Sequence, residues 1–92
     1  MPTAITDTAE LEKLIQPEKL AEQGLPKPKR VAIAAARDHT GDDAYYVYLI
    51  FPNSTPDSAF AWRRIKPLVN WVHDTIWKAN GERHWPYITV KR

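Results

Sequence analysis

The sequence predicts an α+β domain with the element order α-β-β-α-β, and three observations carry this prediction. Two stretches suited to β-strands, 30–37 and 44–51, flank a turn-forming segment around Gly41. After residue 55, apolar residues recur every three or four positions, as they do on one face of a helix. A last strand-like stretch, 84–92, follows Gly81.

The N-terminal part of the chain predicts a short helix and a proline-rich linker. Asp7 followed by Glu10 three residues later is a capping-box pattern. Pro17 ends or kinks this helix, and the closely spaced prolines that follow Gly24 make a stiff connector. We therefore divide the chain into a helical segment with linker, 1–29, and a ββαβ core domain, 30–92.

The long helix of the core domain has a clear predicted start and a predicted kink. Thr55 suits an N-cap, and Pro56 suits the first helical position. Pro67 lies inside the apolar repeat and predicts a kink or break. The simplest sheet is three-stranded and antiparallel, with the first strand in the middle and the one long kinked helix on one face.

Composition excludes several classes of protein. The 92 residues suffice for one domain, and the absence of Cys excludes disulfides and thiolate zinc sites. The longest apolar run, 44–51, is far below the ~20 residues that span a bilayer, and the N-terminus lacks the pattern of a secretory signal. We expect a cytoplasmic protein that neither crosses nor binds a membrane.

Charge is unevenly distributed along the chain. The formal net charge is only +2, yet residues 52–92 hold seven Lys and Arg against three Asp and Glu. This imbalance permits an anionic partner, including nucleic acid. The candidate nucleic-acid-binding residues are the seven bases of that half: Arg63, Arg64, Lys66, Lys78, Arg83, Lys91 and Arg92.

Period-two alternation assigns the strand residues to two faces of the sheet. The face toward the long helix holds mainly larger apolar residues: Val31, Ile33, Ala35, Val47, Leu49, Phe51, Ile88 and Val90. The opposite face holds alanines flanked by larger side chains: Ala32, Ala34, Ala36, Tyr46, Tyr48, Ile50, Tyr87 and Thr89.

Such a face needs a cover, and three covers fit it. The N-terminal helix could fold back over the alanines. A second protein chain, identical or different, could bind the rigid amphipathic rings of Tyr46, Tyr48 and Tyr87. Single-stranded RNA could stack its bases on the same rings, although the chain has no RNP motif.

The long helix carries more aromatic residues than a narrow core stripe requires. Trp71 and Trp77 fall just beyond the margins of the aliphatic face. They either wrap the edges of a small core or, with Arg63 and Arg64, anchor a partner, since Trp and Arg are enriched at binding hot spots.

No segment of the sequence forms a recognisable catalytic or metal site. The run Asp38-His39-Thr40-Gly41-Asp42-Asp43 has the residue types of a turn, and its spacing matches no known metal-binding loop. His73 and Asp74 are adjacent on a helix and point about 100° apart. His84 has no nucleophile that can be assigned to it. We expect no enzyme activity, no cofactor and no metal.

The stretch "VAIAAARDHTGDDAYYVYLIFPNSTPD" and the closing "HWPYITVKR" resemble small uncharacterised bacterial proteins with an acidic-glycine hairpin turn, a "TP" helix start and a "WPY" motif. The resemblance covers about residues 31–92, and residues 1–29 have no counterpart in it. Such proteins are often encoded beside HEPN-type partners in arrangements like those of toxin–antitoxin pairs, so the resemblance implies a small accessory protein that binds another protein. It implies no catalytic residue.

The sequence thus predicts a small protein-binding module that acts as an antitoxin, inhibitor or adaptor. Its predicted interface is the tyrosine face (Tyr46, Tyr48 and Tyr87), with a second surface formed by Trp71, Trp77, Arg63 and Arg64. The alternative function is nucleic-acid binding through the basic C-terminal half.

Overall fold

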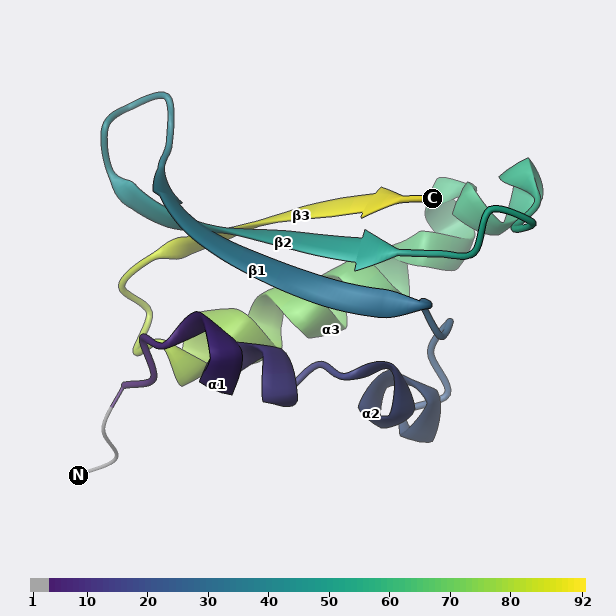
Figure 1. Cartoon of the computed structure of the whole chain (residues 1–92), viewed down its shortest axis with the longest axis horizontal. Coiled ribbons are helices and arrows are strands. Elements are labelled where there is room, and N and C mark those ends of the chain that lie inside the picture. Colours follow the sequence, from purple (N-terminus) through teal and green to yellow (C-terminus); the bar gives the residue numbers. More distant parts are fainter. Residues whose placement is uncertain (1–3) are drawn as a thin grey trace.

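A computed structural model describes residues 4–92, which form a three-stranded sheet with its helices gathered on one face (Figure 1). Along the chain, the elements are α1 (Thr8–Lys13), α2 (Pro17–Glu22), β1 (Arg30–Arg37), β2 (Asp43–Ile50), the 3-10 helix η1 (Asp57–Phe60), α3 (Trp62–Ala79) and β3 (Trp85–Lys91). The α+β class and the element order agree with the sequence-based prediction.

The strand order is β1-β2-β3, so the predicted antiparallel sheet with the first strand in the middle is wrong. Strand β2 is central, and it pairs antiparallel with β1 and parallel with β3. The 18 residues of α3 rise by about 27 Å, which returns the chain to the end of the sheet where β2 begins. The most apolar strand thereby gains neighbours on both sides, and Val47 and Leu49 are fully buried.

The predicted single kinked helix is also wrong. Residues Asp57–Phe60 form a 3-10 turn, and α3 begins only after Ala61, whose extended backbone separates the two. The helix then continues through Pro67, the predicted breakpoint. Pro67 has no backbone N–H to donate to the carbonyl of Arg63. Both residues lie on the exposed side of the helix, where water can donate to that carbonyl instead.

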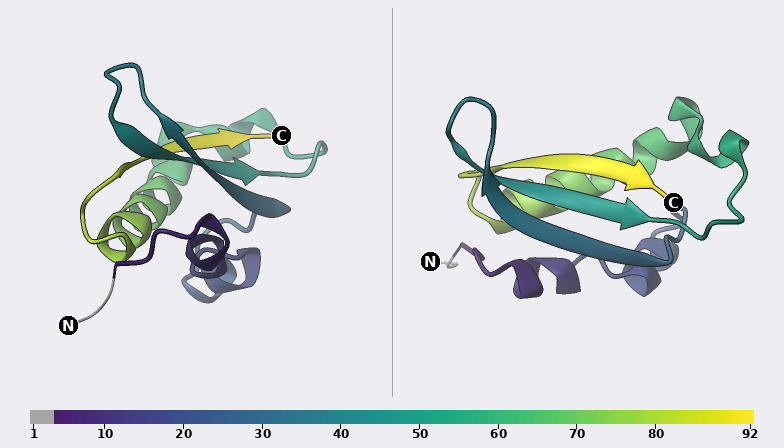
Figure 2. Two further views of the ribbon diagram at one scale, coloured as in Figure 1. Left: turned by 60° about the vertical axis from the view of Figure 1, so that its left-hand side comes forward. Right: turned by 45° about the horizontal axis from the view of Figure 1, so that its top comes forward.

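The N-terminal helices pack on the same face of the sheet as α3 (Figure 2). Leu11, Ile15 and Leu20 are fully buried in one core with residues of α3 and of all three strands. Burying a leucine of this kind stabilises a fold by about 1.5–3 kcal/mol. The alternative in which the N-terminal helix covers the alanines and tyrosines is therefore wrong.

Two polar residues fix how the elements join. The Glu12 carboxylate accepts a hydrogen bond from the backbone N–H of Ile33 (3.3 Å) and so ties α1 to the outer edge of β1. Asn80, fully buried, donates to the carbonyls of Ile76 and His84 and accepts from the backbone N–H of Arg83 and His84. One side chain thus closes α3 and starts the connection to β3.

Candidate functional site

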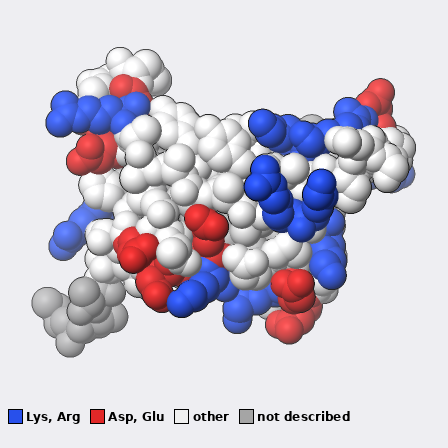
Figure 3. All heavy atoms as spheres, viewed as in Figure 1, with Lys and Arg blue, Asp and Glu red and all other residues white. Residues whose placement is uncertain are grey.

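Within residues 4–92, no element covers the side of the sheet away from the helices, and we call this side the open sheet face. It consists of small residues on β1 and larger ones on β2 and β3: Ala32, Ala34, Ala36, Tyr46, Tyr48, Tyr87 and Thr89. The strand register sets Ala34, Tyr46 and Tyr87 in one row across the sheet. Figure 3 shows a largely uncharged stretch here between the charged hairpin and a group of Lys and Arg near the C-terminal end.

The three tyrosines of the open sheet face are held by neighbours. The rings of Tyr46 and Tyr87 stack with centroids 5.2 Å apart and planes 17° from parallel. The hydroxyl of Tyr87 donates to Asp38 Oδ2 at 3.0 Å, and the ammonium of Lys91 lies 5.7 Å from the centre of the Tyr48 ring. A surface whose side chains are already ordered loses less entropy when a partner binds.

Asp38 organises the hairpin turn between β1 and β2. Its Oδ1 accepts hydrogen bonds from the Thr40 N–H (2.9 Å), the Thr40 hydroxyl (2.6 Å) and the Asp42 N–H (3.1 Å). These bonds, led by that of the Thr40 hydroxyl, lower the pKa of Asp38 from 3.8 to about 2. The hydrogen bond to Asp38 in turn raises the pKa of Tyr87. The segment 38–43 is therefore a turn whose central carboxylate is occupied by its own neighbours.

Metal-ligating side chains do not converge in the described part of the chain. Across residues 4–92, no three His, Asp or Glu side chains are grouped so that they could hold an ion.

The two ends of the open sheet face carry opposite charges. At one end, Arg30, Ile50 and Lys91 form the last row of the sheet. At the other end, the hairpin curls away from the helices and toward the open sheet face (Figure 1). Asp38 accepts the hydrogen bond of Tyr87 there, and Asp42 is exposed beside it, whereas Asp43 shares the other side of its strand with Tyr45 and lies against Arg37. The face is thus basic at one end, apolar and aromatic in the middle, and acidic at the other.

The structure separates the tryptophans and arginines of the predicted second surface. Trp71 is partly buried against the core, whereas Trp77 packs near the end of α3 against Trp85, with ring centroids 5.4 Å apart. Arg63 and Arg64 are exposed in the first turn of α3, about 20 Å from Trp77 along the helix axis. These four residues do not form one continuous patch.

Sequence reasoning passed over Trp85 as an aromatic surface residue. It is 49% exposed, and its ring meets those of Trp77 and His73. The strand-like stretch 84–92 places Trp85 on the third strand. Its contact with α3 could not be predicted, because it depends on the parallel crossover between β2 and β3.

The seven basic residues of the C-terminal half are distributed over both ends of the molecule. Arg63, Arg64 and Lys66 lie at the start of α3, whereas Lys78 and Arg83 lie around its end. Lys91 and Arg92 close the chain beside β3. Arg92 is already engaged: it donates to the carbonyl of Thr55 (3.0 Å), pairs with the Asp57 carboxylate and lies over the Phe60 ring. This spacing does not produce one continuous basic track.

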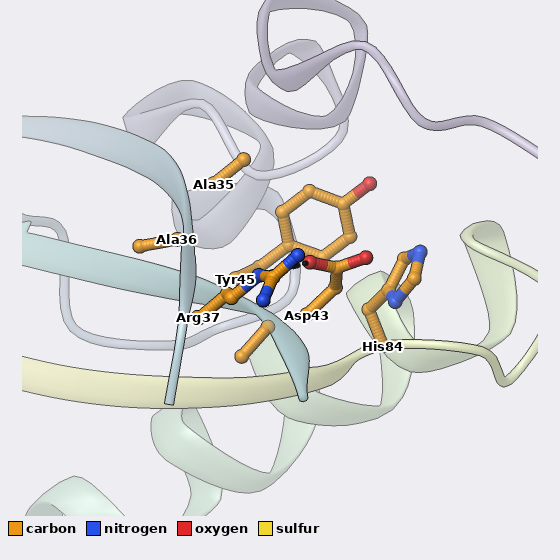
Figure 4. A pocket seen from close by; sticks show the side chains of 7 residues that line it. Ala35, Ala36, Arg37, Asp43, Tyr45 and His84 are labelled. Carbon is orange, nitrogen blue, oxygen red and sulfur yellow. Dashed lines mark ion pairs between the residues drawn. The ribbon is translucent and has the colours of Figure 1, made fainter. Parts of the chain in front are cut away.

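Two clefts lie beside the hairpin end of the sheet. The smaller, about 270 Å³, is bordered by the end of β1, the start of β2 and His84 (Figure 4). Ala35, which alternation assigned to the core, is exposed here because β1 extends beyond the helix layer. The larger cleft, about 500 Å³, is lined by three carboxylates, two tryptophan rings and two cationic or imidazole groups: Asp38, Asp42, Asp43, Trp77, Trp85, Arg83 and His84.

The smaller cleft offers little chemistry to a substrate. Arg37 and Asp43 lie across it at 3.9 Å (dashed in Figure 4), and both are largely exposed. The Tyr45 ring packs edge-on against that of His84, and its hydroxyl donates to the carbonyl of Thr6 at 3.0 Å. Burial, and secondly the charge of Asp43, raise the pKa of Tyr45, so its hydroxyl keeps its proton. The arrangement anchors the N-terminal segment to the sheet.

No protein-family model, curated protein or solved structure matches this chain. Among the helices of residues 4–92, none combines the length and the apolar character that a bilayer crossing requires.

Proposed function

We propose that this protein is a non-enzymatic module that binds another protein through the open sheet face. The observation that carries the proposal is the packing of α1, α2 and α3 on one side of the sheet, so that none of the residues from 4 to 92 covers the tyrosines of the other side. Uncovered aromatic and alanine side chains in one contiguous area are typical of interaction surfaces. An antitoxin, inhibitor or adaptor role follows from the resemblance to proteins encoded beside HEPN-type partners.

The ring geometry favours a protein over single-stranded RNA. Bases stack on aromatic faces that point outward from a sheet. Here Tyr46 and Tyr87 turn their ring faces toward each other, and Lys91 lies over the ring of Tyr48. The acidic hairpin at one end of the face would also repel phosphates. Nucleic-acid binding through the dispersed basic residues is the alternative function, and the experiment has to distinguish it from protein binding.

The test is a pull-down from the native lysate with tagged protein, washed at about 50 and about 300 mM salt, with and without nuclease. We expect a stoichiometric protein that survives both treatments. Tyr46→Ala should weaken its binding at least about fivefold, since a hot-spot tyrosine contributes more than about 1 kcal/mol. Trp62→Ala is the control, because Trp62 is exposed on α3, in the helix layer.

Other outcomes would contradict the proposal. If the bound material disappears with nuclease or at the higher salt concentration, the protein binds nucleic acid. If Trp62→Ala or charge reversal at Arg63 and Arg64 removes the partner while Tyr46→Ala keeps it, the start of α3 is the interface.

A further inference from the structure

The open sheet face has the shape of a shelf beside a ridge. Strand β1 contributes only alanines at 32, 34 and 36, whereas β2 and β3 contribute Tyr46, Tyr48 and Tyr87. The shelf extends from the Arg30 row to the hairpin, about 20 Å along the strand. The small alanine side chains let a helix approach the sheet closely, and the tyrosine rings beside them contact one side of that helix. A second flat sheet could not contact the alanines and the tyrosines at the same time.

The sheet topology is compatible with a helix as the missing cover. Strands β2 and β3 form a parallel pair joined through α3, and sheets built wholly of parallel strands have both faces covered, usually by helices; here one of the two strand pairs is parallel. In the described residues, the helices all lie on one face. A helix on the other face would complete a three-layer α/β/α arrangement.

The charges at the two ends of the open sheet face set the direction of such a helix. A helix carries partial positive charge at its N-terminus and partial negative charge at its C-terminus. Asp38, which is bonded to Tyr87, and the exposed Asp42 lie at the hairpin end of this face, and Arg30 and Lys91 lie at the opposite end. The favourable orientation places the N-terminus of the helix beside the hairpin.

A second copy of this chain fits the face poorly. A two-fold axis along the strands sets the ridge of one copy over the shelf of the other, but it also sets Arg30 and Lys91 over the same residues of that copy. A two-fold axis across the strands brings opposite charges together, but it sets alanines over alanines and leaves the shelf unfilled. No single two-fold axis satisfies shape and charge together.

From these observations, we infer that the open sheet face binds an amphipathic helix of a different protein. The apolar stripe of that helix lies on the alanine shelf against the tyrosine ridge. Its C-terminal end, rich in carboxylates, lies over Arg30 and Lys91. This inference rests on the proposed protein-binding function and specifies the chemistry of the partner.

Photo-crosslinking from two positions on the shelf tests the inference. The chain contains no cysteine, so Ala32→Cys and Ala36→Cys each accept one short thiol-linked diazirine label. Residues 32 and 36 lie about 13 Å apart on the strand, a distance that a helix spans in about nine residues and a strand in about four. Labelled protein is irradiated in native lysate, and the crosslinked partner residues are mapped by mass spectrometry. Lys13→Cys, on the exposed side of α1, is the control.

The expected result is a pair of crosslinks within one segment of one protein. The residues that react with the label at position 32 should lie about nine positions C-terminal to those that react with the label at position 36. A spacing of about four residues, crosslinks to another copy of this chain, crosslinks to nucleotides, or the reverse order would overturn the inference.

The inference and the proposed function can fail separately. If a protein co-purifies with the chain but neither shelf position crosslinks to it, the helix-on-shelf inference fails and protein binding stands. If no protein co-purifies, the proposed function itself fails.

Discussion

The contact between Asp38 and Tyr87 links the hairpin turn to the open sheet face, and titration should reveal it. The Tyr87 hydroxyl donates to Asp38 at 3.0 Å, and this bond raises the pKa of Tyr87. Asp38→Asn removes the acceptor charge and should lower the pKa of Tyr87 toward its ordinary value near 10. The measurement is the ¹³Cζ chemical shift of Tyr87 against pH. An unchanged Tyr87 titration in this variant would contradict the contact.

The same pair predicts how the turn responds to acid. Because the folded-state pKa of Asp38 is lowered from 3.8 to about 2, its stabilising contribution is complete above about pH 4 and is lost as the pH falls toward 2. Thr40→Ala removes the largest cause of the shift, the Thr40 hydroxyl, and should raise the Asp38 midpoint toward 3.8. The carboxyl ¹³C titration of Asp38 in the two proteins checks this.

A single buried amide holds the connection from α3 to β3. Asn80 satisfies two backbone N–H groups and two carbonyls, and its side chain is fully buried. Asn80→Ala should lower the free energy of unfolding by about 1–3 kcal/mol, the usual cost of leaving buried polar groups unpaired. Urea denaturation measures the loss. Asn70→Ala, on the exposed side of the same helix, should change stability by less than about 0.5 kcal/mol.

At the scale of elements, local signals predicted which segments form strands and helices but not how the strands are ordered. The predicted strands 30–37 and 44–51 and the turn between them depend only on residues close in the sequence. They were confirmed as β1, β2 and the hairpin that joins them. The position of β3 depends instead on the length and path of α3 across the sheet. No local pattern in 84–92 distinguishes a parallel from an antiparallel neighbour.

The helix through Pro67 gives a prediction at the same scale. Proline in a helix interior costs about 3 kcal/mol relative to alanine, and this one lies six residues into α3 on its exposed side. Pro67→Ala restores an N–H that can donate to the Arg63 carbonyl and should raise the free energy of unfolding by about 1–3 kcal/mol. Pro56→Ala, at an extended position before η1, should instead leave it unchanged or lower it by up to about 1 kcal/mol. Thermal unfolding of the two variants distinguishes these results.

For the whole molecule, the composition of the open sheet face was predictable and its lack of a cover was not. Period-two alternation correctly placed Tyr46, Tyr48 and Tyr87 on one face. Whether the N-terminal helices covered that face depended on where Leu11, Ile15 and Leu20 are buried. All three could reach either side through the proline-rich linker, and they join the core shared with α3.

The shape and charge of the open sheet face together predict the state of the isolated protein. Since no two-fold arrangement matches both the ridge with the shelf and the basic end with the acidic end, the purified chain should sediment as a monomer. Ala34→Glu places a charge in the centre of the shelf, where Ala34 is exposed, and should change neither the sedimentation nor, by more than about 0.5 kcal/mol, the stability. The same substitution should abolish capture of the partner. A dimer that Ala34→Glu converts to monomer would show instead that this face joins two copies of the chain.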